Sequence, residues 1–331
     1  MKYSVTPNFS LPLISELERP MNIISIISPL VIVGLIGFLA AKKNWFNKAQ
    51  IDALSKFTFH LAIPAFLFQQ LANADLSTVD LSIYGAFYLP VLMVYGLGWI
   101  FNFYFHQKLK TSMPASAVYA LATSYSNNVI VGMPVALMVL GEQVLPTIFL
   151  VVSLHSALLF GLTSILAAND KQFNWRLFLK QTFYNPLLIA ITGGFIVNLL
   201  AIKLPNLIND SLLLLGRPAI TLALFLLGAS LAFYHIRSEI RFILSASILK
   251  LLLLPSLVFI SCHLIWQFPP IITATLVILS ASPTGVNAYL IAKQQDKHQD
   301  TVAGVVVATT LLSIATLPLL LWFLLPIETV N

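Results

Sequence analysis

Charged residues are scarce in this chain, and acidic residues are the scarcest of them. Only 9% of the 331 residues are Asp, Glu, Lys or Arg, whereas 58% are hydrophobic. A soluble domain carries about 25% charged residues, so this composition indicates an integral membrane protein. None of the twelve acidic residues lies deep in an apolar segment. A carrier that relays protons through a buried carboxylate is therefore not supported.

Cysteine and the common catalytic motifs are also missing. The single cysteine, Cys262, excludes an intrachain disulfide and a multi-cysteine metal site. The sequence has no GKS or GKT phosphate loop and no HExxH or GxSxG motif, which argues against direct use of ATP and against protease or acyl-hydrolase chemistry. We therefore expect neither an enzyme nor a bound cofactor or metal.

Long hydrophobic runs make up most of the chain, and each is of the length that crosses a bilayer as a helix. Barrel strands alternate and are shorter, so helices are the only plausible interpretation. Residues 1–22 are predicted to be a polar extension and not a signal peptide, with Met21 as an alternative start. The ten apolar segments are 23–41, 51–73, 80–105, 114–140, 144–168, 184–202, 211–234, 240–265, 270–293 and 300–325.

Basic residues are unevenly distributed between the connections, which predicts an orientation. The positive-inside rule makes the odd-numbered connections cytoplasmic and puts both termini outside. The net charge of +6 is thus a topology signal, and no basic domain for nucleic acid is present. The odd-numbered connections and their flanks hold Lys42, Lys43, Lys48, Lys56, Lys108, Lys110, Lys171, Arg176, Lys180, Arg237, Arg241, Lys293 and Lys297.

Ten helices with both ends outside divide into two halves of five, 23–168 and 184–326, joined by a short cytoplasmic linker at 169–183. Because five is odd, the second half enters from the opposite face, so any internal duplication is inverted. The predicted fold class is therefore an all-α integral membrane protein with ten transmembrane helices in two inverted five-helix repeats.

Two of the segments are interrupted at corresponding places. The fourth reads Ser124-Tyr125-Ser126-Asn127-Asn128 and continues to Gly132 and Pro134, and the ninth reads Ser280-Ala281-Ser282-Pro283-Thr284-Gly285-Val286-Asn287. Counted from Pro114 and from Pro270, both breaks begin thirteen residues on, about 20 Å at helical rise and near mid-membrane. Paired interrupted helices are typical of the substrate site of a secondary carrier.

The breaks carry the candidate substrate-binding residues. Asn127 and Asn128 offer amide donors and acceptors for a carboxylate or a cation. Gly132 and Pro134 suit the start of a new half-helix whose N–H groups favour an anion. Alternatively, these amides only hold neighbouring helices together. Pro283, Thr284 and Asn287 take the mirrored part in the ninth segment, and Ser126 and Ser282 are further candidate contacts to substrate or coupling ion.

Two titratable residues lie inside other segments. His155 is about 16 Å into the fifth segment, where it could carry a coupled proton or bond the substrate. The alternative is a neutral histidine bonded to a neighbouring carbonyl or serine. Lys250 is about 15 Å into the eighth. It either pairs with an anionic substrate or snorkels to the basic side, and its long stem favours snorkelling.

Four strings of residues resemble the auxin efflux carrier family, which includes bacterial organic-acid permeases and plant auxin exporters. The resemblance runs from about residue 21 to the end of the chain. The strings are HLAIPAFLFQQLANADL (60–76), YSNNVIVGMPVAL (125–137), LFLLGASL (224–231) and SPTGVNAYLIAKQ (282–294).

The resemblance implies a fold similar to bile-acid symporters and sodium/proton antiporters. Helices 1, 2, 6 and 7 would form a scaffold that also dimerises, and helices 3–5 and 8–10 would form a moving unit in which helices 4 and 9 cross. Pro64 and the region of Gly228 would face the crossing from the scaffold. The family moves organic anions, such as malate or auxin-like acids, by an elevator-like alternation. The short loop between helices 5 and 6 favours the bacterial permease branch, and hence a bacterial inner membrane.

The leading hypothesis from the sequence is a secondary carrier of small mono- or dicarboxylates, with H⁺ or Na⁺ as the coupling ion. The rival is a sodium-coupled symporter of the bile-acid type, in which the amides and freed carbonyls hold Na⁺. A third class would be an ion channel, which usually repeats one pore around a symmetry axis. Two inverted breaks in one chain favour alternating access instead.

Overall fold

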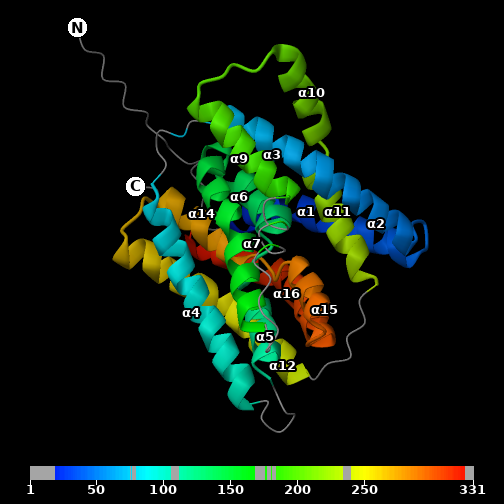
Figure 1. The fold of residues 1–331 in the computed structure, drawn as a ribbon, viewed down its shortest axis with the longest axis vertical. Coiled ribbons are helices and arrows are strands. Elements are labelled where there is room, and N and C mark those ends of the chain that lie inside the picture. The colour runs from blue at the N-terminus through cyan, green and yellow to red at the C-terminus, as the bar shows by residue number, and fades with distance from the viewer. Residues whose placement is uncertain are drawn as a thin grey trace.

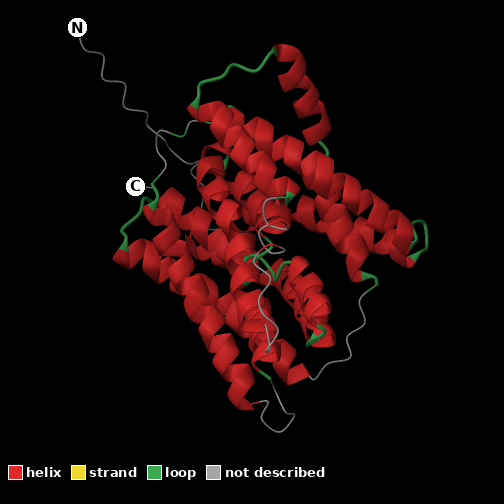
Figure 2. Cartoon of the chain, in the orientation of Figure 1, coloured by secondary structure: helices red, strands yellow, loops and turns green. Residues whose placement is uncertain are grey.

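A computed structural model describes residues 19–74, 76, 80–105, 112–167, 176, 180, 184–233 and 240–324 of the protein. Over these residues the chain is helical, and apart from one isolated bridge between Ser126 and Thr284 they contain no β-structure (Figure 2). The prediction of an all-α protein is confirmed for this part of the chain. The predicted extension at 1–22 and linker at 169–183 fall mostly outside it.

The first half of the chain contains three long helices, α1, α4 and α7, and several shorter ones. Its elements are α1 (Arg19–Lys42), α2 (Lys48–Phe57), the π-turn η1 (Thr58–Ala62), α3 (Ile63–Ala72), α4 (Ser82–Phe105), α5 (Met113–Ser124), the π-turn η3 (Asn128–Gly132), α6 (Met133–Leu140), the 3₁₀ turn η4 (Glu142–Val144) and α7 (Leu145–Ala167).

The second half ends in the longest helix of the described chain. Its elements are α9 (Pro186–Leu199), α10 (Asn206–Gly216), α11 (Ala219–Leu231), α12 (Ile240–Ile248), the π-turn η5 (Leu249–Leu253), α13 (Leu254–Ile260), the π-turn η6 (Ser261–Ile265), α14 (Pro270–Ala281), α15 (Asn287–Gln295) and α16 (Gln299–Leu324).

Six continuous helical runs among the described residues are long and apolar enough to cross a membrane, and four shorter apolar helices accompany them. Two of the shorter ones, Asn128–Leu140 and Pro270–Ala281, are parts of the two interrupted segments. The six long runs are Lys48–Ala72, Ser82–Tyr104, Glu142–Ala167, Asn206–Leu231, Ile240–Ile265 and Gln299–Leu324.

Polar and apolar side chains are distributed as expected in a bilayer. Large apolar side chains lie outside, with Leu207 80% and Phe323 77% exposed, whereas Ser124, Ser280 and Thr284 are completely buried. Water would not favour this arrangement, but hydrocarbon does, because buried polar groups can then bond one another away from lipid. The protein is therefore a multi-pass membrane protein.

The helices pack in two groups (Figure 1). In one group α1 lies along α11, and α3 lies between α9 and α10. In the other, α4 packs on α5, α5 on α7, α13 on α14 and α12 on α16. The α1–α11 contact is especially close. A Cβ at Gly228 would collide with the Gly34 carbonyl, and one at Gly37 would collide with the Phe225 carbonyl.

Three of the π-turns stand directly before a helix that has proline at its second position. These prolines are Pro64 after η1, Pro134 after η3 and Pro255 after η5. Proline has no N–H to donate and its ring crowds the carbonyl four residues back, so a widened turn relieves the conflict. The π-turn before Pro134 is the one that holds Asn128.

Candidate functional site

The first break separates α5 from α6. Helix α5 ends at Ser124, and Tyr125 is extended, with φ −77° and ψ 112°. Asn127 follows with φ −79° and ψ 62°, and Asn128 then opens the π-turn that leads into α6. The helix therefore ends three residues before Asn127, the residue at which the sequence places the start of the break.

The second break separates α14 from α15. Helix α14 ends at Ala281, and Ser282 turns away from helical geometry with φ −59° and ψ 147°. The residue before a proline is driven out of the helical region by the proline ring, which explains the conformation of Ser282. Helix α15 starts again at Asn287.

The two breaks pair with each other. Asn127 N–H donates to the Pro283 carbonyl at 2.8 Å, and Gly285 N–H donates to the Tyr125 carbonyl at 3.1 Å. Ser126 and Thr284 lie between these bonds as an antiparallel bridge. Backbone groups freed inside a membrane must be satisfied by protein, water or ligand, and here each break satisfies part of the other.

We call the place where the two breaks pair, residues 125–128 and 282–285, the crossing. Thr284 bonds the crossing to α5 and α16. Its hydroxyl donates to the Ala122 carbonyl at 2.7 Å, in the last turn of α5. Its N–H donates to the Thr309 hydroxyl of α16 at 3.0 Å. Thr284 is completely buried, so its position is determined on every side by protein.

Lys250 lies at the crossing and is completely buried. Its ammonium donates to the Ser280 carbonyl at 2.6 Å and to the Ser126 hydroxyl at 2.9 Å. The expectation that Lys250 snorkels toward the basic side is wrong. The π-turn η5 carries Lys250, and its stem reaches the end of α14 instead of the membrane surface.

His155 of α7 lies against the first break. Its Nε2 accepts the Ser126 N–H at 2.9 Å, so this nitrogen carries a lone pair and the neutral ring has its proton on Nδ1. The ring stacks on Tyr125, with centroids 5.0 Å apart and planes 20° apart. The neutral-histidine alternative is thus realised, although its partner is a backbone N–H.

The two asparagines are buried with unused polar atoms. Asn127 is 6% and Asn128 3% exposed. The amide nitrogens of both, and the amide oxygen of Asn128, have no hydrogen-bond partner among the described residues, and neither does His155 Nδ1. Buried polar groups almost always have partners, so a cluster of unpaired ones requires an explanation.

A cavity of about 1080 Å³ reaches this cluster. The buried part of its lining includes Ser126, Asn127, Asn128 and His155. Its walls come from α2, η1, α7, α9, α11 and α15, and thus from both groups of helices. Asn287 also lines it, but from an exposed position at the start of α15.

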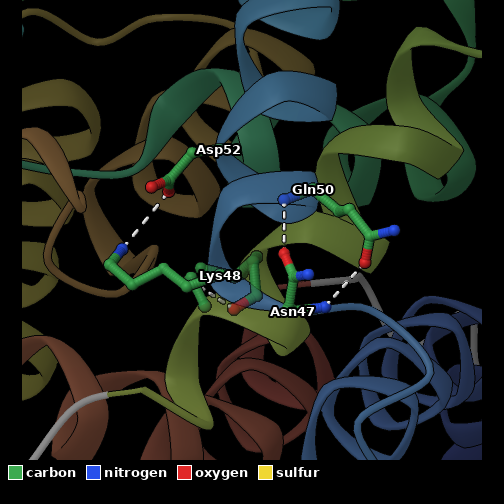
Figure 3. A network of polar contacts seen from close by, with 6 residues as sticks. Asn47, Lys48, Gln50 and Asp52 are labelled. Atoms are coloured by element: carbon green, nitrogen blue, oxygen red, sulfur yellow. Dashed lines mark hydrogen bonds and ion pairs between the residues drawn. The ribbon is translucent and has the colours of Figure 1, made fainter.

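Charge is distributed unevenly along this cavity. Lys48, Lys56 and Lys293 line it at exposed positions, and Asp52 is the one acidic residue in its described lining. Lys48 bonds Asp52 at 3.2 Å. The α2 capping box, in which Asn47 and Gln50 bond each other's backbone, starts the helix beside this pair (Figure 3). The excess of lysine gives the cavity a positive potential, which attracts anions.

The remaining predicted residues lie behind the cavity wall. A Cβ on Gly132 would meet the Ser282 hydroxyl at 2.7 Å, so these two residues hold α6 and α14 close together. Pro134, Pro283 and Thr284 are buried in the same packing and are not part of the cavity lining. Pro64 likewise lies outside the lining, while Gly228 faces α1.

Sequence reasoning missed Tyr125 and Ser156 as residues of the site. Their hydroxyls lie 2.9 Å apart, and both line the cavity. Tyr125 directly precedes the Ser-Asn-Asn run, a signal that could have identified it. Ser156 could be found only from its place next to His155.

A second cavity of about 320 Å³ lies between α3, α9 and α10. Three of the four asparagines in its lining are bonded, and the fourth, Asn206, is exposed. Asn198 Nδ2 donates to the carbonyls of Leu71, Ala72 and Ala74, and Asn73 Nδ2 donates to Gln69 and Asn209. It therefore lacks the buried, unused amides that distinguish the first cavity. No group of three or more metal-ligating side chains occurs among the described residues.

Comparison with known proteins agrees with this geometry. A family described as "Membrane transport protein" matches residues 22–170 and 174–321, nearly the whole chain. The chain belongs to this family, the auxin efflux carrier family, and the resemblance stated from the sequence is confirmed.

Two similar proteins cover almost the same length. A "Putative malonate transporter" of Rhizobium meliloti (strain 1021) is 24% identical over 317 residues, 92% of this chain and 96% of that protein. An "Uncharacterized transporter" of Methanothermobacter thermautotrophicus is 25% identical over 300 residues, 89% and 96% of the two chains. This chain is therefore a membrane transporter and not an enzyme.

Proposed function

We propose that this transporter carries small mono- or dicarboxylates, such as malonate or malate, and binds them at the crossing of the two breaks. The observation that carries the proposal is the cluster of buried, unpartnered donors on Asn127, Asn128 and His155 in the lining of a cavity. A carboxylate only accepts hydrogen bonds, so it complements this set.

The backbone favours the same ligand. Asn128 begins the π-turn that leads into α6, and the N–H groups at the start of such a half-helix favour an anion. The lysines along the cavity raise the local concentration of anions further. The malonate named for the Rhizobium relative belongs to this substrate class.

We further propose that transport is an elevator-like alternation of the two groups of helices. The first group, with α1, α2, α3, α9, α10 and α11, would be a scaffold that also forms a homodimer. The second, with α4–α7 and α12–α16, would move and carry the crossing. The cavity between the two groups supports this division, because such a boundary is where substrate would enter and leave.

The finer architecture is part of the same proposal. Ten spanning helices would form two inverted five-helix repeats in a bacterial inner membrane, with both termini outside. The pairing of two helix breaks that occupy matching positions in the two halves supports it.

The second candidate is a sodium-coupled symporter. Freed carbonyls such as that of Ser280, at the end of α14, are of the kind that coordinates Na⁺ in carriers. Strict dependence of carboxylate uptake on Na⁺ would support it over the first candidate.

A thermal-shift titration with malonate, malate and acetate tests the substrate site in detergent. Wild-type protein should be stabilised by at least one carboxylate, and Asn128→Ala should lose the shift, because it removes the unpaired Nδ2 donor that would bond the carboxylate. Asn206→Ala is the matched control, since Asn206 is exposed at the start of α10. An unchanged thermal shift in Asn128→Ala would show that the carboxylate does not bind at the crossing.

A further inference from the structure

We propose that the Lys250 ammonium is a resident cation of the crossing, which makes carboxylate binding independent of Na⁺. The inference rests on the proposed function. It assigns to a side chain the place that a bound metal cation takes in sodium-coupled carriers.

The oxygens around Lys250 are those of a cation site. Ser280 contributes a carbonyl in the last turn of α14, and Ser126 contributes a hydroxyl from the opposite break. The Ser126 hydroxyl points its own proton at the Ser280 carbonyl, 3.4 Å away, so it accepts from Lys250. Both partners therefore act as acceptors toward the ammonium. The 2.6 Å contact to Ser280 is short, as charge-assisted hydrogen bonds are.

The Ser280 carbonyl needs such a partner because its helical one is engaged elsewhere. In a continuous helix it would accept from the N–H of Thr284, four residues on. That N–H instead donates to the Thr309 hydroxyl. The lysine thus caps a carbonyl that the break has released.

The position of Lys250 also determines the sign of the local field. The end of α14 is the negative pole of its helix dipole, and it lies directly against Ser126, next to Asn127 and Asn128. Left uncovered, this pole would repel a carboxylate bound at the asparagines. A cation on Ser280 neutralises it, and a covalently held cation does so without any ion from solution.

Among the residues that the structure describes, no acidic side chain pairs with Lys250. Its ammonium donates to the Ser280 carbonyl and the Ser126 hydroxyl, and the ion pair between Lys48 and Asp52 lies elsewhere, in α2. His155 at the first break accepts the Ser126 N–H on Nε2, so this nitrogen carries no proton and the ring adds no charge. The negative pole of α14 therefore offsets part of the ammonium charge, but no carboxylate of the described residues competes with a bound anion for it.

Malonate titration of purified protein in sodium chloride and in choline chloride tests the inference. Wild-type affinity should agree within twofold between the two salts. Lys250→Met, which keeps the length of the side chain without the charge, should bind at least tenfold more weakly in both salts. Wild-type binding that requires Na⁺, or full affinity in Lys250→Met, would overturn the proposal.

Rescue of Lys250→Ala by an added cation distinguishes a role of the lysine charge from a purely structural role of the side chain. Lys250→Ala leaves space for a small cation, so ethylammonium or Na⁺ should restore part of the lost affinity, whereas choline, which has no N–H donor, should not. A loss that neither cation repairs would contradict the proposal. If wild-type protein binds no carboxylate in any salt, the carrier hypothesis itself fails, a result distinct from normal binding in Lys250→Met.

Discussion

The side chain of Asn128 is buried, and neither its amide nitrogen nor its amide oxygen has a hydrogen-bond partner among the described residues. An unpaired buried donor or acceptor costs about 1–3 kcal/mol, which a protein tolerates where a ligand completes the bonds. Asn127 and His155 each have one unpaired buried nitrogen, and both line the same cavity. Three neighbours with the same deficit indicate a site better than any one of them.

At the residue level, the sequence pointed to polar residues that the structure brings together, but it did not indicate their bonding partners. Asn127, Asn128, Ser126 and His155 could be chosen because polar residues are conspicuous in apolar segments. The partner of Lys250 could not be predicted, because Ser280 and Ser126 belong to other segments and meet it only in the folded protein.

At residue scale we predict that Gly132→Ala impairs transport. Its Cβ would lie 2.7 Å from the Ser282 hydroxyl and 2.9 Å from the Leu279 side chain, so these two completely buried side chains, or the helices that carry them, would have to shift. Overpacking of this kind costs about 1–3 kcal/mol, and we expect a lower melting temperature and at least tenfold slower uptake.

Gly96→Ala in α4 is the matched control for this prediction. A Cβ there has no neighbour within 4 Å, so melting temperature and uptake should stay at wild-type values or rise slightly. Equal behaviour of the two variants would show that the close contact between the breaks is not needed.

At the scale of elements, the sequence identified where two segments break but not how the others bend. The Pro and Gly of 114–140 and 270–293 are clear interruption signals, and α5 and α14 do end there. The π-turns before Pro64 and Pro255 were not predicted. Prolines 29, 90 and 318 lie inside regular α-helices, so proline alone does not identify a π-turn.

The α1–α11 crossing provides a prediction about the proposed scaffold. Gly228→Ala places a methyl group on the Gly34 backbone, which cannot move aside, and should lower stability by about 1–3 kcal/mol. Gly34→Ala should be tolerated, because its Cβ would make only an ordinary 3.7 Å contact with the Leu224 carbonyl. Melting curves in detergent would reveal this asymmetry. Equal melting temperatures of the two variants would exclude a tight backbone contact at Gly228.

For the whole molecule, composition was sufficient to predict a helical membrane protein, and charge asymmetry was sufficient to propose an orientation. The cavity could not be predicted in the same way. Its walls combine α2, α7, α9, α11 and α15, which are far apart in sequence, and hydropathy contains no information on which helices become neighbours.

Cysteine labelling tests the proposed orientation. In a Cys262→Ser background, Asn206→Cys should react with a membrane-impermeant maleimide in intact cells, because the loop before α10 is predicted to lie outside. Lys297→Cys should react only after permeabilisation. Cys262 is completely buried, so the background substitution removes only a residue that packs in the core. The reverse pattern of labelling would show that the chain has the opposite orientation in the membrane.

Uptake of labelled malonate into proteoliposomes tests the central claim most directly. Wild-type protein and Asn206→Ala should accumulate label by exchange against internal malonate, whereas Asn128→Ala should fall to the level of empty liposomes while remaining folded in detergent. Uptake by Asn128→Ala at the wild-type rate would contradict the assignment of the paired breaks as the carboxylate site.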